Sequence, residues 1–156
     1  MAVFQAYDGR GEQTALTTLL LDYFEVRDVP SIIPAVFQSE QPRSTIAPIS
    51  RIVMETYDNK DTVSKRIVEK AAIELSRIIK AMQKKLELNE TSHPIYLSGG
   101  IFNRTDVFIP LFKKHFDGDV RFKRLEHEPV VGAVVAALKS INIKVTDSFK
   151  TKTNIL

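Results

Sequence analysis

Two adjacent glycines lie where a predicted strand turns into a predicted helix, and they are the residues best placed to bind a ligand. The apolar stretch from Pro94 to Leu97 is typical of a short strand, and Ser98, Gly99 and Gly100 follow it. Glycine has no Cβ atom, so a flat ligand can approach the backbone closely there, and positive φ angles are accessible. Amide groups at the start of the following helix would point toward a bound molecule. Small-molecule sites of α/β proteins favour the carboxyl end of a strand, although such glycines can also serve only to pack a helix against a sheet.

The hydrophobic pattern predicts an α/β chain that is rich in helix. Residues 94–98 and 120–125 have the composition of strands, and the helix between them predicts that they are parallel. Helices are expected near residues 12–24, 45–57, 62–88, 104–116 and 130–140. Shorter helices are expected before the turn at residues 8–11 and around residues 32–37. In the last long helix, Gly132, Ala133, Ala136 and Ala137 form a small-residue face suited to close packing on a sheet.

The longest predicted helix follows Asp61, which is expected to cap it. Apolar residues recur along it at steps of three and four and therefore share one face: Val63, Ile67, Ala71, Leu75, Ile78, Met82 and Leu86. This stripe predicts a core helix or an interface helix, and no catalytic residues are evident on it.

Composition excludes several classes of function. The chain of 156 residues has 22 basic and 19 acidic residues, which are interspersed, so a nucleic-acid-binding surface is not expected. It has no cysteine, which excludes thiolate metal sites and a cysteine nucleophile. His93, His115 and His127 are too scattered to form a metal site, and the acidic residues beside His127 favour a solvated loop. Neither a signal peptide nor a membrane-spanning run is evident, which predicts a cytoplasmic protein.

Three motifs in order resemble the N-acetylglucosamine kinase and BadF-type ATPase family of the sugar-kinase, Hsp70 and actin superfamily. The first is Asp-Gly-Arg-Gly at residues 8–11, with Thr14 and Leu16 after it. The second is Leu-Ser-Gly-Gly-Ile-Phe at 97–102, and the third is Pro-Val-Val-Gly-Ala at 129–133. The resemblance covers about residues 1–141 and includes the long helix between the first two motifs.

The resemblance implies the C-terminal part of an actin-like, ribonuclease-H-like ATPase lobe over residues 1–143, followed by a polar tail at 144–156. Ser98, Gly99 and Gly100 match the family's adenosine motif, so they are the expected cofactor-binding residues. The complete enzyme would use ATP with Mg²⁺ and would phosphorylate an amino sugar. Asp8 and Arg10 lie in the family's turn. They either contact a ligand, or Asp8 caps the next helix and Arg10 pairs locally.

The family's two phosphate loops and its acidic catalytic base have no match in this sequence. Phosphoryl transfer depends on such groups to position and neutralise the phosphates. We therefore expect no catalytic residue in this chain, no metal ligand and no phosphotransferase activity from it alone. The expected partners are an N-terminal half of the same protein and, through an unpaired sheet edge, further copies of the chain.

Two other functions remain open. The chain is alternatively the matching part of a BadF-type ATPase that activates a dehydratase. That branch carries an iron–sulfur cluster bound by cysteines, which are absent here. The third possibility is a dimerisation or binding module without catalysis, with the long helix as its interface.

Overall fold

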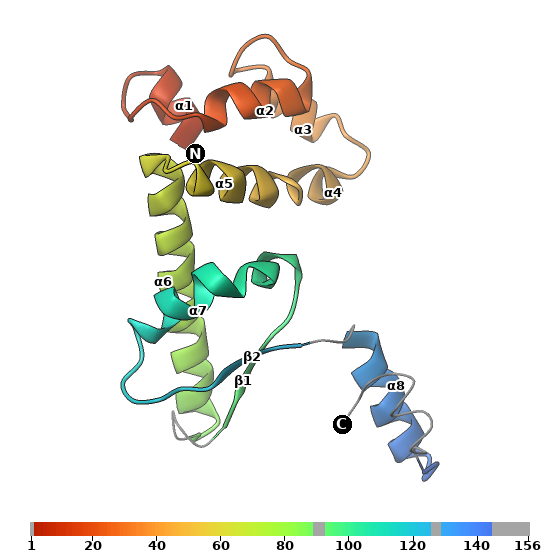
Figure 1. Cartoon of the computed structure of the whole chain (residues 1–156). Helices are drawn as coiled ribbons and strands as arrows, with labels where there is room; N and C mark the ends of the chain where they lie inside the picture. Colours follow the sequence, from red (N-terminus) through yellow and green to blue (C-terminus); the bar gives the residue numbers. More distant parts are fainter. Residues whose placement is uncertain (1, 89–92, 126–128, 145–156) are drawn as a thin grey trace. The chain divides into compact units, whose positions relative to one another are not determined.

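The computed structural model describes residues 2–88, 93–125 and 129–144, and these divide into two compact units (Figure 1). The first unit comprises Met1–Met82 and the second Gln83–Leu156. The expected tail lies outside the described residues from residue 145 onward.

The first unit is entirely helical within its described residues. Its helices are α1 (Ala2–Tyr7), α2 (Leu16–Phe24), α3 (Ile32–Phe37), α4 (Pro42–Ile46), α5 (Ile49–Asp58) and the greater part of α6 (Thr62–Lys85). One apolar cluster joins α1, α2, α3 and the first turn of α6, and it consists of Val3, Leu16, Leu20, Val29, Ile32 and Val63. All the helices expected from the sequence in this region are present, with the different boundaries described next.

Two helix boundaries in this unit differ from the prediction. The helix expected from residue 12 begins at Leu16, because Thr14 and Ala15 donate hydrogen bonds to the distant Asp61 carboxylate. The helix expected over residues 45–57 is two helices, α4 and α5, and Pro48 immediately precedes α5. Proline has no amide hydrogen to continue a preceding helix, whereas it is well tolerated where a helix begins.

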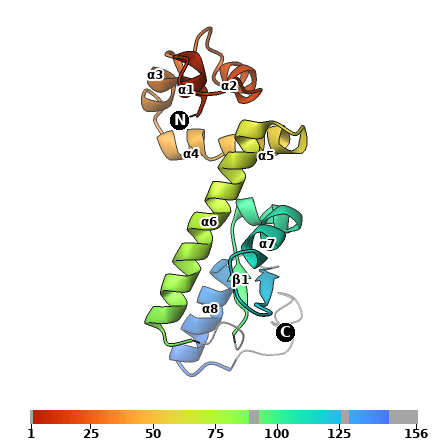
Figure 2. The ribbon, with the colours of Figure 1, turned by 90° about the vertical axis from the view of Figure 1, so that its left-hand side faces the viewer.

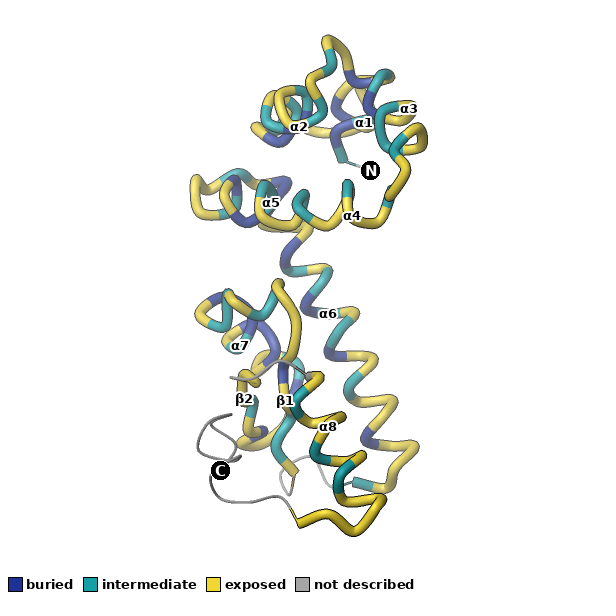
Figure 3. The backbone as a smooth tube through the Cα atoms, turned by 90° about the vertical axis from the view of Figure 1, so that its right-hand side faces the viewer, coloured by how far each residue is buried: buried dark blue, intermediate teal, exposed yellow. Residues whose placement is uncertain are grey.

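Helix α6 begins and ends close to its predicted limits (Figure 2), and Asp61 caps it as expected. The Asp61 Oδ1 atom accepts a hydrogen bond from the Ser64 amide at 2.7 Å. The apolar stripe of α6 was expected to lie in the core or at an interface. Val63 lies in the core, whereas Ile78 and Met82 are 58% and 56% exposed. Farther along the helix, buried positions alternate with exposed ones (Figure 3), and the buried residues are mostly small or polar.

The second unit contains a parallel pair of strands, as predicted. Strand β1 (Ile95–Leu97) pairs with β2 (Phe122–Arg124), and Leu97 is in register with Arg124. Between them come the 3₁₀ helix η1 (Gly100–Arg104) and α7 (Thr105–Lys113), and α8 (Pro129–Ser140) follows. Parallel strands need such a crossover, because their like ends lie at the same edge of the sheet.

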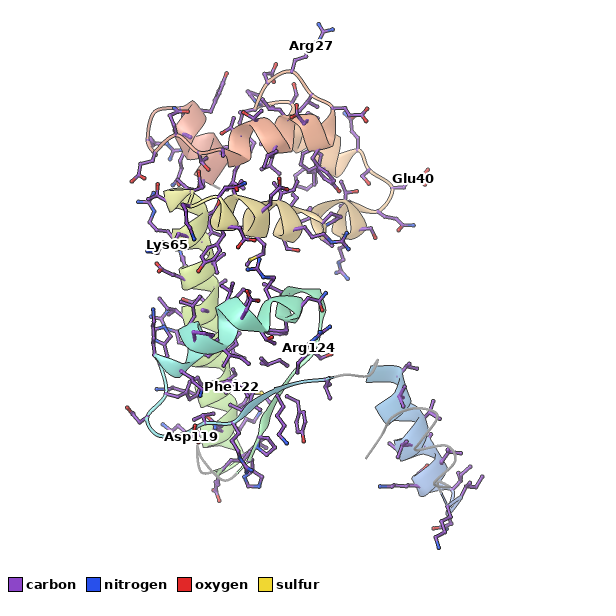
Figure 4. The ribbon with its side chains drawn as sticks, in the orientation of Figure 1. Arg27, Glu40, Lys65, Asp119, Phe122 and Arg124 are labelled. Atoms are coloured by element: carbon purple, nitrogen blue, oxygen red, sulfur yellow. The ribbon has the colours of Figure 1, made fainter. Side chains whose placement is uncertain are left out.

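An aromatic cluster forms the core beneath the crossover helix. Phe112 has no exposed surface, and its ring lies 5.9 Å from that of Phe108 and 5.4 Å from that of Phe122, which Figure 4 labels. The small-residue face predicted for α8 is not packed on the sheet, since a sheet of two short strands offers little surface to cover. Its members are all exposed: Gly132, Ala133, Ala136 and Ala137.

A candidate functional site at the end of strand β1

The structure places Ser98, Gly99 and Gly100 at the carboxyl end of β1, and all three are exposed. Gly99 has φ of 109° and ψ of 162°, a conformation that a residue with a side chain rarely adopts. A Cβ atom built on either glycine would meet no atom within 4 Å beyond its chain neighbours and the adjoining helix backbone. The space above the two glycines is thus open, and the expected close approach of a flat molecule to this backbone is sterically possible.

The 3₁₀ helix η1 begins at Gly100 and separates Gly99 from α7. The α-helix expected near residues 104–116 is confirmed as α7, which ends at Lys113. The Phe102 amide donates to the Gly99 carbonyl at 3.0 Å and closes the first turn of η1. Such tight turns are common at the start of α-helices.

Contacts on both sides fix the backbone of the glycine turn. The Leu125 amide donates to the Leu97 carbonyl at 2.9 Å and extends the pairing of the strands to the last residue of β1. The Phe102 ring lies 6.0 Å from that of Phe108 and belongs to the aromatic cluster. The exposed segment 98–100 is therefore supported by a buried core on one side and by strand pairing on the other.

Asn103 and Arg124 form a further support that the sequence did not indicate. The guanidinium of Arg124, which Figure 4 labels, donates to Asn103 Oδ1 at 2.6 Å and joins η1 to the end of β2. The two residues are 21 positions apart and share no motif. The sequence offered one indirect signal for this contact. Asn103 follows the first predicted strand and Arg124 lies near the end of the second, and the ends of parallel strands meet at the same edge of a sheet.

The acidic and basic side chains at the start of α7 balance one another. The Arg104 guanidinium pairs with Asp106 at 2.9 Å, and its hydrogen bonds hold the pKa of Asp106 below the ordinary value. Arg104 is thus committed to its neighbour, and an ionised Asp106 stands in the first turn of α7. The start of α7 consequently adds no uncompensated positive charge to the open backbone and the Ser98 hydroxyl of the site. These groups are suited to binding an uncharged, flat part of a ligand.

No set of three or more acidic, histidine or cysteine side chains that could hold a metal ion occurs among residues 2–88, 93–125 and 129–144. The acidic residues Glu126 and Glu128 and the intervening His127 lie outside the described residues. None of the helices in the described part of the chain is long and apolar enough to cross a bilayer.

The turn at residues 8–11 is held by its own side chains. The Arg10 guanidinium donates to Asp8 Oδ2 at 2.6 Å, and this hydrogen bond lowers the pKa of the Asp8 carboxyl. The local pairing expected for Arg10 is thereby confirmed. The expectation that Asp8 caps the next helix is wrong, since α2 has no capping side chain and the Ala15 amide before it donates to Asp61. Asp61 could not be assigned this second role from sequence, because it is 46 residues away.

An open pocket of about 540 Å³ lies beside this turn, between α1 and the first turns of α6. Its cationic side chains include Arg10 and Arg66. Arg10 is paired with Asp8, and Arg66 is paired with Glu12 at 2.7 Å. Because Asp8 and Arg10 are paired with each other, the pocket gives no reason to assign either of them a ligand, and we place the candidate site at residues 98–100.

Comparison with known proteins covers both the turn at residues 8–11 and the candidate site at residues 98–100. Residues 1–137 match the BadF/BadG/BcrA/BcrD ATPase family. The chain is 28% identical over 139 residues to an N-acetylmuramic acid/N-acetylglucosamine kinase of Clostridium acetobutylicum. This alignment covers 87% of the present chain and 45% of the kinase, so the chain spans less than half the length of that relative.

Proposed function

This chain belongs to the BadF/BadG/BcrA/BcrD ATPase family, and on that premise we propose that it is the nucleotide-binding C-terminal part of an ATP-dependent sugar kinase. In this proposal the adenosine end of ATP lies against Ser98, Gly99 and Gly100. The fold would be the C-terminal part of an actin-like lobe, and the acceptor would be an amino sugar. The expected dehydratase-activating ATPase and the non-catalytic module are the alternatives.

One observation carries the assignment of the nucleotide site. Gly99 and Gly100 stand exposed at the carboxyl end of a parallel strand, and no side chain beyond their chain neighbours lies within 4 Å of where their Cβ atoms would be. A purine is flat and can lie close to a backbone that bears no side chains. The neighbouring Ser98 hydroxyl can donate or accept a hydrogen bond at a polar edge of the nucleoside.

The residues present fit the adenosine end of the nucleotide and not its phosphates. Arg104 is paired with Asp106 beside the site, and the described residues offer no acidic cluster for Mg²⁺. ATP with Mg²⁺ would supply the phosphoryl group and neutralise its charge when bound in the complete enzyme. The present chain would contribute the surface that orients the nucleoside, and the catalytic base and phosphate loops would come from another part.

Titration of the chain with adenosine, ATP and N-acetylglucosamine, followed by two-dimensional NMR, tests this proposal. We expect adenosine and ATP to shift the resonances of residues 98–102 with similar, weak affinities, and the sugar to have little effect. Shifts confined to other segments would disprove the site.

The variant Gly100→Val makes the test specific. Gly100 does not have a positive φ, and its surroundings are open, so a valine should be compatible with the fold while filling the space of the purine. We expect at least about tenfold weaker adenosine binding, equivalent to about 1.4 kcal/mol. Ala137→Val, at an exposed position of α8, is the matched control and should bind normally. Equal affinities of the two folded variants would contradict the assignment.

A further inference from the structure

Arg124 is an exposed cation at the same edge of the sheet as the glycine turn. It is the last residue of β2 and is in register with Leu97, which immediately precedes Ser98. Neighbouring strands lie about 5 Å apart, so the long Arg124 side chain begins beside the turn. Phe122, two residues earlier on the same strand, packs on the aromatic cluster. Because side chains alternate along a strand, Arg124 shares the sheet face of Phe122, whereas Lys123 points to the opposite face.

Asn103 fixes the direction in which the guanidinium points. Arg124 Nη2 donates to Asn103 Oδ1 at 2.6 Å. Asn103 stands three positions after Gly100 in η1, and residues three apart in a 3₁₀ helix lie on the same side. The guanidinium is therefore held on the side of η1 that carries Gly100, where the space above the backbone is open.

The two arginines near the site differ in the charge of their partners. Arg104 is paired with the carboxylate of Asp106. The hydrogen bond of Arg124 goes to the amide oxygen of Asn103, which is neutral, so that bond orients the guanidinium without compensating its charge. An exposed guanidinium is planar and only weakly hydrated, and it stacks favourably on the face of an aromatic ring.

We propose that Arg124 binds the nucleoside by stacking its guanidinium on the purine, and that Asn103 is the residue that positions it. The purine would then lie between the backbone of Gly99 and Gly100 and the plane of the guanidinium. The inference rests on the proposed nucleotide site, to which it adds a contact from the second strand. It concerns the base of the nucleotide, so it requires no phosphate.

Adenosine titrations of single and double variants, followed by two-dimensional NMR, test this inference. We expect Arg124→Ala to bind adenosine about fivefold more weakly, as the loss of one partly exposed cation–aromatic contact predicts. The loss should be the same for ATP as for adenosine. Lys123→Ala removes an exposed cation from the opposite face of the same strand; it is the matched control and should bind normally.

The double variant tests the role of Asn103. Asn103→Ala should weaken adenosine binding by a smaller factor, because the guanidinium remains present but is no longer held in place. In combination with Arg124→Ala it should cause no further loss, since a residue that acts through another has no effect once that other is removed. A full additional loss in the double variant would show that Asn103 does not act through Arg124.

Three outcomes would overturn the inference, and the first two of them leave the proposed nucleotide site intact. If the wild type binds adenosine and the folded Arg124→Ala variant binds as tightly as Lys123→Ala, the nucleotide site stands and the stacking contact is wrong. A loss for ATP alone would assign Arg124 to a phosphate instead of the base. If the wild type binds no adenosine, both the nucleotide site and the contact are refuted.

Discussion

Replacing Asp61 by alanine should destabilise the first unit more than any other change to one of its exposed or half-buried carboxylates. Asp61 Oδ1 accepts a hydrogen bond from the Ser64 amide at 2.7 Å and caps α6. Its Oδ2 accepts from the Thr14 hydroxyl and from the Ala15 amide, both at 3.0 Å. A single side chain thus holds the start of α6 and the segment that leads into α2, two parts of the sequence that are far apart.

The magnitude follows from these three hydrogen bonds. Loss of a capping side chain costs about 1 kcal/mol. Each hydrogen bond to a charged acceptor contributes roughly 1.5 kcal/mol or more, although the exposed Ala15 amide can bond to water instead. We therefore expect Asp61→Ala to lower the free energy of unfolding of the first unit by about 3 kcal/mol. Asp61→Asn retains one oxygen acceptor and should lose about half of that amount.

Hydrogen–deuterium exchange followed by mass spectrometry is the suitable assay, because it reports on the two units separately. A loss of about 3 kcal/mol corresponds to roughly hundredfold faster exchange in α2 and in the first turns of α6. Peptides from α7 should be unchanged. Asp22→Ala, which removes an exposed carboxylate of α2, is the control and should change stability by less than about 0.5 kcal/mol. If Asp61→Ala exchanged no faster than this control, the three hydrogen bonds would not contribute as argued.

Three further predictions concern the stability of the two units. Although burial raises the pKa of Asp61, its hydrogen bonds outweigh this effect and hold the pKa below the ordinary value. The stabilisation of the first unit by the ionised Asp61 should therefore be complete at neutral pH and disappear as the pH falls through the lowered pKa. The unfolding free energies of wild type and Asp61→Ala, measured at decreasing pH, should thus converge. Phe112→Ala empties a fully buried position of the aromatic cluster and should lower the free energy of unfolding of the second unit by about 3 to 5 kcal/mol, measured by urea unfolding. A decrease below about 1 kcal/mol would contradict this prediction. Gly11→Ala places a Cβ atom 2.9 Å from that of Gln5 in α1 and should lower the melting temperature, whereas Ala137→Val should not, as differential scanning calorimetry can determine.

Much of the fold was predictable because local patterns specify local structure. The cap on α6 needed only an aspartate before a helical periodicity, and the structure has it at Asp61. The parallel strands followed from two short segments of strand-like composition separated by a helix, and β1 and β2 pair as expected. The turn at Gly99 and Gly100 could also be inferred, because paired glycines after a strand suit a turn, and Gly99 has the positive φ that such a turn allows.

The partners of individual side chains could not be predicted. Asp61 accepts hydrogen bonds from Thr14 and Ala15, and Arg124 binds Asn103. Each of these pairs joins residues distant in sequence, and nothing in the local pattern of either residue specifies its partner. Asp8 shows a similar limit at short range: it precedes a helix, but its carboxylate pairs with Arg10 and does not cap that helix.

The sequence by itself determined which residues of α6 share a face, because that depends only on the helical repeat. It did not determine whether that face enters the core. Burial depends on what packs against a helix, and the core cluster reaches α6 only at Val63, so Ile78 and Met82 remain exposed. In the same way, the glycines at 99 and 100 marked a place where a ligand could approach. Only the tertiary structure decided that the space above them is open, because any distant side chain could have filled it.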